Sequence, residues 1–128
     1  MSVKKEKNEI PLDKLTLYDE LIKTIPDIER KGVKLPYTSF NGHMFTFLSE
    51  SGVLAIRLPE SEREFFLKQY NSSLMESQGT IVKEYVAVPE SVLKNTKELK
   101  KYLNMSYEYV KTLKPKAQKL NKEKIKKS

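Results

Sequence analysis

The sequence predicts one α+β domain, in which an antiparallel sheet of about four strands packs with an N-terminal helix, a mid-chain helix and a C-terminal helix. Its length of 128 residues suits one domain with one core. The apolar residues gather between Leu12 and Leu113 and follow helical spacing in three places. Between these places lie short runs rich in β-branched and aromatic residues, bounded by glycine and proline.

The first helix is expected over about residues 17–31. Its apolar face consists of Leu17, Leu21, Ile25 and Ile28. Thr16 and Asp19 resemble a capping box, in which side chains accept hydrogen bonds from N–H groups of the first turn. Pro26 lies inside the pattern, so we expect the helix to end or kink near Thr24.

Three strands are expected next, joined as a meander. Residues 44–48 form a strand with apolar side chains on both faces, and a glycine-containing turn leads to the returning strand at residues 53–58. An earlier strand is expected within residues 33–41, because Asn41-Gly42 is a two-residue signal for a type I′ turn.

The mid-chain helix is expected to follow Pro59 and to end by Asn71, with Ser61 and Glu64 as a second capping box. Its buried face is expected to consist of Phe65, Phe66, Leu67 and Tyr70. A looser segment then leads to Gly79.

The last part of the domain contains a strand and the best-patterned helix. The strand is expected over residues 81–88 and one helical turn over residues 90–94. The helix is expected over residues 96–113, with Asn95 and Glu98 as its capping pair. Its apolar face is traced by Leu99, Tyr102, Leu103, Ser106, Val110 and Leu113.

We divide the chain into a flexible basic N-terminus (residues 1–10), the α+β domain (11–113) and a lysine-rich tail (114–128), for which we expect disorder. Of the net charge of +7, the tail contributes +6, from seven lysines and one glutamate. Residues 1–7 contribute +2, from three lysines and one glutamate, which leaves −1 for residues 8–113. The basic character therefore belongs to the two ends.

The chain contains no cysteine, which excludes disulfides, thiolate nucleophiles and cysteine-ligated metal sites. The charged N-terminus has no apolar run after its lysines, so we do not expect a secretory signal. No segment approaches the roughly 18 consecutive apolar residues of a membrane-spanning helix. A cytoplasmic protein without a membrane partner is the resulting expectation.

His43 is the only histidine, and no second histidine or spaced carboxylate pair accompanies it in the sequence. Metal sites need three or four convergent ligands, and a hydrolytic dyad needs a nucleophile within hydrogen-bond reach. We therefore interpret His43 as a strand residue that follows a turn.

Glu60, Glu62 and Glu64 form an acidic cluster that could hold a metal or serve as an acid–base pair. They fall in the first turn of an expected helix, where the helix dipole favours carboxylates, so we interpret them as structural. The four glycines are isolated, which excludes a phosphate-binding loop of the usual spacing. We assign no catalytic residue, cofactor or metal site.

The aromatic residues could stack on single-stranded nucleic acid, but such surfaces interleave aromatic and basic residues. Phe45 and Phe47 lie in an apolar context and are interpreted as core residues. Tyr85 beside Lys83 is the nearest approach to the interleaved pattern.

The lysine tail is the one feature that points to a ligand outside the core. The candidate nucleic-acid contacts are Lys114, Lys116, Lys119, Lys122, Lys124, Lys126 and Lys127. Such a tail attracts phosphate backbones or anionic lipid without sequence discrimination, and the attraction falls with salt. The alternative is a tail that only solubilises the chain.

The order of elements and three motifs resemble the N-terminal domain of TfoX-type proteins, the competence-regulator family with its many stand-alone bacterial relatives. The resemblance rests on the hairpin at residues 44–58, on Tyr85-Val86-Ala87-Val88-Pro89-Glu90, and on the capped helix that contains Leu99. Residues 37–42 stand where the family commonly has an arginine-containing Met-Phe-Gly-Gly stretch. The resemblance implies a small α+β fold with no enzymatic activity and a regulatory or uncharacterised role.

Three functions remain open at this point. The preferred one is a non-catalytic TfoX-N-like module that acts through a protein or nucleic-acid partner or by self-association. The second is a weak, sequence-nonspecific nucleic-acid binder that loses affinity when residues 114–128 are removed. The third is a small enzyme whose site combines His43 with tyrosine and glutamate residues. The first predicts an exposed apolar patch or a free sheet edge, and the third a deep pocket.

Overall fold

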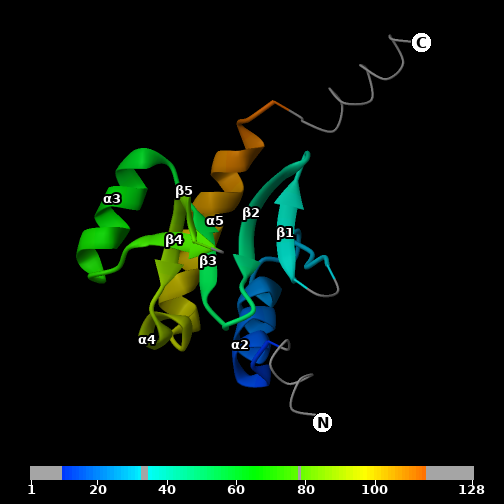
Figure 1. Cartoon of the computed structure of the whole chain (residues 1–128). Helices are drawn as coiled ribbons and strands as arrows, with labels where there is room; N and C mark the ends of the chain where they lie inside the picture. The colour runs from blue at the N-terminus through cyan, green and yellow to red at the C-terminus, as the bar shows by residue number, and fades with distance from the viewer. Residues whose placement is uncertain (1–9, 33–34, 78, 115–128) are drawn as a thin grey trace.

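A computed structural model describes residues 10–32, 35–77 and 79–114 of the chain (Figure 1). Within these residues it has four helices and one antiparallel sheet of five strands, which confirms the α+β class. The helices are α2 (Leu12–Lys23), α3 (Glu60–Gln69), α4 (Glu90–Leu93) and α5 (Thr96–Lys111). The strands are β1 (Tyr37–Phe40), β2 (His43–Leu48), β3 (Leu54–Arg57), β4 (Leu74–Ser77) and β5 (Thr80–Val88).

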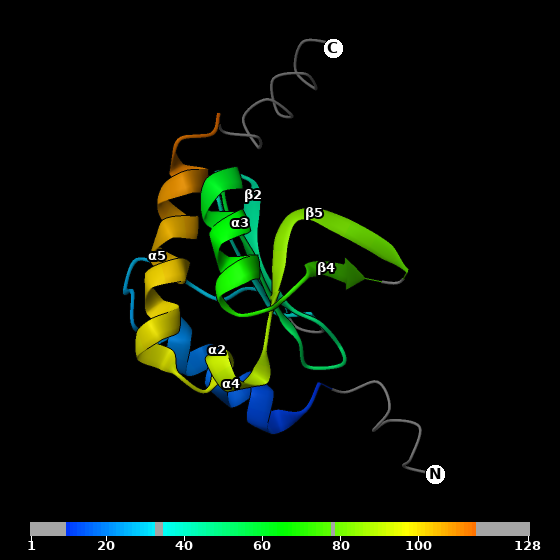
Figure 2. The same ribbon diagram turned by 90° about the vertical axis from the view of Figure 1, so that its left-hand side faces the viewer.

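The sheet has the strand order β1-β2-β3-β5-β4. The first three strands form the expected meander, and β5 pairs antiparallel with both β3 and β4. Figure 2 shows the four helices gathered on one side of the sheet, while the β4–β5 hairpin extends to the other side. The sheet therefore has one face covered by helices and one that is not.

The main core lies between the helices and the covered face of the sheet. Its largest fully buried side chains include Tyr18 from α2, Phe66 from α3 and Leu103 from α5. Burial of a large apolar side chain stabilises a fold by about 1.5–3 kcal/mol, so this core provides most of the driving force. Three buried hydroxyl groups form a row of hydrogen bonds at this core. The Thr46 hydroxyl lies 2.7 Å from the Tyr18 hydroxyl and 2.6 Å from the Thr38 hydroxyl.

The turn between β1 and β2 is the one that the sequence predicts. Asn41 has φ 53° and Gly42 has φ 84°, and a type I′ turn requires positive φ at both of its central residues. The turn fixes the pairing of Phe40 with His43 at the start of β2.

The first helix differs from its prediction at both ends and in its cap. It begins at Leu12, five residues earlier than expected, so Thr16 lies in the helix interior and donates its hydroxyl to the Leu12 carbonyl at 3.0 Å. The predicted capping box is therefore wrong. The helix ends at Lys23, which confirms the effect of Pro26 on the chain near Thr24.

The mid-chain helix has the predicted place and a different cap. It starts directly after Pro59 without a side-chain cap, and Ser61 donates to the Glu62 carboxylate instead. Phe66 is fully buried, and Leu67 and Tyr70 are partly buried against the main core, as predicted. The prediction is wrong for Phe65, which is 56% exposed on the outer side of the helix.

The segment expected to be loose contains a fifth strand, β4. Helix α5 confirms its predicted cap, since the Asn95 side chain accepts from the Glu98 N–H at 3.3 Å. The predicted apolar face of α5 is buried from Leu99 to Val110, and the single turn α4 is also confirmed. Among the described residues, no helix has the length and apolar character needed to cross a membrane.

Candidate functional site

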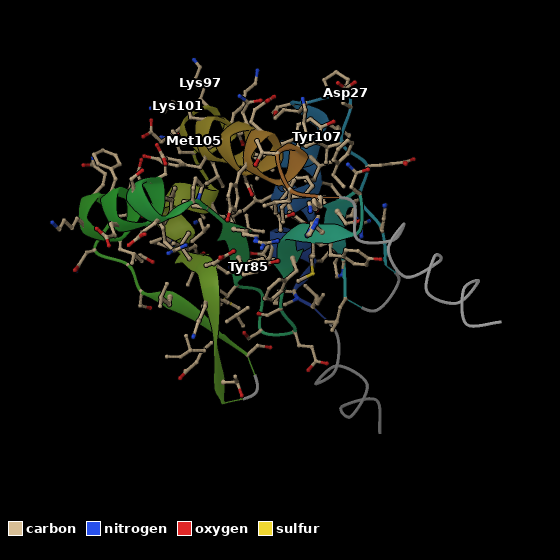
Figure 3. All side chains as sticks on the ribbon, turned by 90° about the horizontal axis from the view of Figure 1, so that it is seen from above. Asp27, Tyr85, Lys97, Lys101, Met105 and Tyr107 are labelled. Carbon is tan, nitrogen blue, oxygen red and sulfur yellow. The ribbon has the colours of Figure 1, made fainter. Side chains whose placement is uncertain are left out.

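A second apolar cluster lies on the face of the sheet that the helices leave uncovered, which we call the open face. Ala55, Met75 and Tyr85 are its buried members. The partly buried side chains packed against them are Met44, Phe47, Val53, Val82 and Ala87. In Figure 3, Tyr85 lies on the side of the strands away from α5, whose outer surface carries Lys97, Lys101 and Met105.

A bulge in β2 divides its side chains between the two faces. Thr38 pairs with Thr46 and Ser39 pairs with Met44, so Phe45 is the extra residue opposite β1. Phe45 consequently joins Thr46 in the buried main core, where its ring stacks on Tyr107 at 5.6 Å between centroids. Met44 is left to the open face. The apolar side chains expected on both faces of this strand are thus present, with the bulge deciding which face each takes.

A larger irregularity bends β5. Leu74 pairs with Val86, but its neighbour Met75 pairs with Val82, so residues 83–85 have no partner in β4. Glu84, within this bulge, has φ 72°. The bulge lets the outer half of β5 and all of β4 leave the plane of the sheet, and Figure 2 shows this hairpin projecting from the open face.

The bend closes the open face into a hollow of about 260 Å³. Strands β2 and β4 are separated by β3 and β5 in the sheet, yet Phe47 and Glu76 line the same space. The residues that line the hollow are Leu35, Phe47, Ser49, Glu50, Ser51, Glu76 and Ser77. The hollow therefore lies between the β2–β3 turn and the tip of the β4–β5 hairpin.

The lining combines apolar, hydroxyl and acidic groups. Leu35 is 48% exposed, and the half-buried Phe47 ring packs on Tyr85 at 5.5 Å between centroids. Glu50 and Glu76 bring two carboxylates, and in the part of the chain described neither forms an ion pair. Among the described residues that line the hollow there is no lysine or arginine, so the charges that these residues bring to it are negative.

Tyr85, which packs against the lining residue Phe47, is held as a neutral side chain. Its hydroxyl donates to the Met44 carbonyl at 2.7 Å. Burial raises the pKa of Tyr85 to about 12, with Glu84 adding to the rise and Arg57 opposing it. Tyr85 thus acts as a support that joins β5 to β2, and not as an acid or base near neutral pH.

Of the lysines expected to contact nucleic acid, the structure describes Lys114 alone. Its carbonyl accepts from Nε2 of His43 at 2.6 Å, so the lone histidine holds the beginning of the tail against the start of β2. The remaining tail lysines (116, 119, 122, 124, 126 and 127) lie outside the described residues.

The other chemical candidates remain apart from each other. Glu60, Glu62 and Glu64 lie at the beginning of α3, and His43 lies at the first position of β2. Within residues 10–32, 35–77 and 79–114, no three His, Asp or Glu side chains converge to hold a metal ion. Lys83 and Tyr85 flank the bulge residue Glu84 and do not form a repeated basic–aromatic surface.

Sequence reasoning missed the hollow because it missed β4. Leu35 stands before β1, and Glu50 and Glu76 stand in segments that read as turn and loop. One signal was available: Leu74-Met75-Glu76-Ser77 precedes Gly79 and a clear strand, which is the pattern of a hairpin.

No protein-family model, curated protein or solved structure matches the chain. The resemblance to TfoX-type N-terminal domains therefore stays a prediction from the sequence.

Proposed function

We propose that this chain is a non-catalytic binding module, of the TfoX N-terminal-domain type, that holds a protein partner on the open face of its sheet. The observation that carries the proposal is the second apolar cluster, which faces away from every described helix and is hollowed between β2 and β4. Accessible apolar surface rimmed by polar residues is the usual mark of a protein–protein contact.

The exposure of individual side chains supports a binding role. Leu35 at the hollow and Ile81 near the hairpin tip are 48% and 53% exposed. Leu35 lies at the hollow and Ile81 in β5. A partner that covers these side chains removes their apolar surface from water, which stabilises the complex by roughly 25 cal/mol per Å² of apolar surface buried.

The placement of the reactive side chains supports a non-catalytic role. The hydroxyls of Ser49 and Ser51 lie 3.0 Å apart and bond to each other. His43 is not among the residues that line the hollow, and its Nε2 donates to the Lys114 carbonyl instead.

The test compares two double variants as baits in quantitative capture from extracts of cells that express the chain. Leu35→Ser with Val82→Ser changes the open face, and Phe65→Ser with Met105→Ser removes apolar side chains of α3 and α5 that are 56% and 36% exposed. We expect a partner that wild type and the helix-side variant retain equally and the open-face variant loses. Equal retention by both variants would place the contact elsewhere, and circular dichroism verifies that both are folded.

The second candidate, a nucleic-acid binder driven by the tail, is favoured by the His43–Lys114 hydrogen bond, which joins Lys114, the first of the tail lysines, to the folded domain. Its test is fluorescence anisotropy of duplex DNA and single-stranded RNA with the full chain and with a variant that carries glutamine at the seven tail lysines. Tail-driven binding disappears in the variant and weakens with salt in wild type. Binding that survives the seven substitutions would move the contact to the domain.

A further inference from the structure

We infer that the hollow receives an extended peptide segment of the partner, with a lysine or arginine side chain placed between Glu50 and Glu76. The inference rests on the proposed function and adds the chemistry of the contact. It follows from three properties of the hollow: its charge, its apolar floor and the free strand edge beside it.

The charge favours a cationic occupant. Glu50 in the β2–β3 turn and Glu76 in β4 line the same hollow, and the described residues supply no cation to either. Elsewhere on the described surface, glutamates form ion pairs with lysines; for example, Oε2 of Glu90 lies 3.2 Å from Nζ of Lys14. A partner whose side chain is positive matches this unpaired pair of carboxylates, whereas an anionic partner is repelled.

The floor favours a long side chain over a bare cation. Phe47 and Leu35 bring apolar surface to the same lining as the two carboxylates. Lysine and arginine carry aliphatic stems that pack on such surfaces while the charged head remains at the polar rim. At about 260 Å³, the hollow is smaller than the roughly 300–1,000 Å³ of pockets that enclose whole cofactors or drug-sized ligands.

The edge favours an extended backbone. Strand β4 ends the sheet and, among the described residues, pairs with β5 alone. At the opposite edge, the backbone of Lys31 pairs with the first residue of β1 through two hydrogen bonds to Tyr37, of 2.7 and 3.0 Å. The outer N–H and C=O groups of β4 can accept an added strand, and Glu76 and Ser77 of this strand line the hollow.

The inference is tested by titrating the ¹⁵N-labelled full chain with blocked peptides that differ at one position. The probes are Ac-Thr-Val-Arg-Val-Thr-NH₂, the same peptide with glutamate in place of arginine, and methylguanidinium alone. We expect the arginine peptide to shift the amide resonances of residues 49–51 and 75–77. The glutamate peptide and methylguanidinium should leave them in place at equal concentration.

The matched variant is Glu50→Gln with Glu76→Gln, which keeps the size of both side chains. This double variant should lower the affinity for the arginine peptide about three- to tenfold, because each exposed charge pair contributes a modest share of the affinity. The control, Glu60→Gln with Glu64→Gln at the start of α3, should not change it.

Three outcomes would overturn the inference: equal shifts from the arginine and glutamate peptides, equal shifts from methylguanidinium, or no shift at residues 49–51 and 75–77. Any of these, together with a partner lost by the open-face variant in the capture experiment, would leave the proposed function standing and remove only the cationic peptide. If one of these outcomes is found and the open-face variant also retains the partner, the proposed function is contradicted as well.

Discussion

Arg57 and Glu84 form an ion pair across the junction of β3 and β5, with 2.7 Å between Nε and Oε1, and this pair holds Glu84 in a left-handed backbone conformation. The Glu84 carbonyl also accepts from the Leu58 N–H at 2.9 Å. Arg57 lies over the Tyr109 ring, 5.6 Å from its centroid. These contacts stabilise the bulge that turns the β4–β5 hairpin out of the sheet, and hence they shape the hollow.

Glycine is therefore expected to be better than alanine at position 84. A left-handed conformation costs a residue with a Cβ about 1–2 kcal/mol, and glycine avoids this cost. Part of the advantage of glycine is offset, because glycine loses more conformational entropy on folding. We expect Glu84→Gly to be about 0.5–1 kcal/mol more stable than Glu84→Ala in urea unfolding. Both variants lack the ion pair, so the comparison isolates the backbone.

The neighbouring position supplies the control for this comparison. Lys83 has no positive φ, so Lys83→Gly should be less stable than Lys83→Ala, as is usual in a strand. The same order at both positions would contradict the left-handed bulge.

Two glycines with the same backbone conformation should respond differently to alanine. Gly52 has φ 88°, and a Cβ there would lie 2.9 Å from Cγ of Lys14 and 3.2 Å from Cγ of Pro11. Gly79 has φ 77°, and a Cβ there would meet no atom within 4 Å. We expect Gly79→Ala to lower the free energy of unfolding by about 1 kcal/mol and Gly52→Ala by about 2 kcal/mol or more.

This pair tests whether the β2–β3 turn, which carries part of the hollow, packs on the beginning of α2. Thermal unfolding of the two variants gives the comparison directly. Equal losses would show that the turn does not contact α2 as described.

The buried hydroxyl chain gives a third prediction. Thr46→Val leaves the Tyr18 and Thr38 hydroxyls without their shared partner, and should cost about 2–3 kcal/mol. Tyr18→Phe keeps the Thr38–Thr46 bond and should cost about 1 kcal/mol. Urea unfolding measures both, and a larger loss for Tyr18→Phe would contradict the shared role of Thr46.

Tyr85 gives a prediction for alkaline pH. Its pKa is raised to about 12 in the folded chain, from about 10 when unfolded, so the folded state favours the neutral phenol. The stabilisation is complete below pH 10 and is lost as the pH rises through 12, a full loss of about 3 kcal/mol.

Tyr85→Phe should therefore be less stable than wild type near pH 8, because its hydrogen bond to Met44 is gone, and should lose less stability between pH 10 and 12. Urea unfolding at a series of pH values tests this. Parallel pH profiles for the two proteins would show that the Tyr85 phenol does not titrate as described.

The elements that the sequence predicts best are those fixed by neighbouring residues. The Asn41-Gly42 turn needs two residues that tolerate positive φ, and the cap of α5 needs only Asn95 and an N–H three residues away. Both are local, so both could be read from the sequence. The start of α2 was predicted five residues too late, because Pro11 precedes it in place of a side-chain cap and Thr16 offered a competing capping pattern.

The hollow depends on contacts between distant residues, which periodicity does not report. Strand β4 has four residues and is stable only as a partner of β5, and Glu84 adopts its conformation beside Arg57, 27 positions earlier. Glu50 and Glu76 meet only after both the bulge and the hairpin have formed. The sequence could show that the strand at residues 44–48 has apolar side chains on both faces. It could not show that the β4–β5 hairpin would leave a hollow over one of these faces.

The most direct measurement of the central claim is hydrogen–deuterium exchange of the full chain, alone and saturated with the partner identified by capture. We predict slower exchange at residues 47–51 and 74–77, which border the hollow, and unchanged exchange in α3 and α5. Slower exchange confined to the helices, with residues 47–51 and 74–77 unaffected, would contradict binding on the open face.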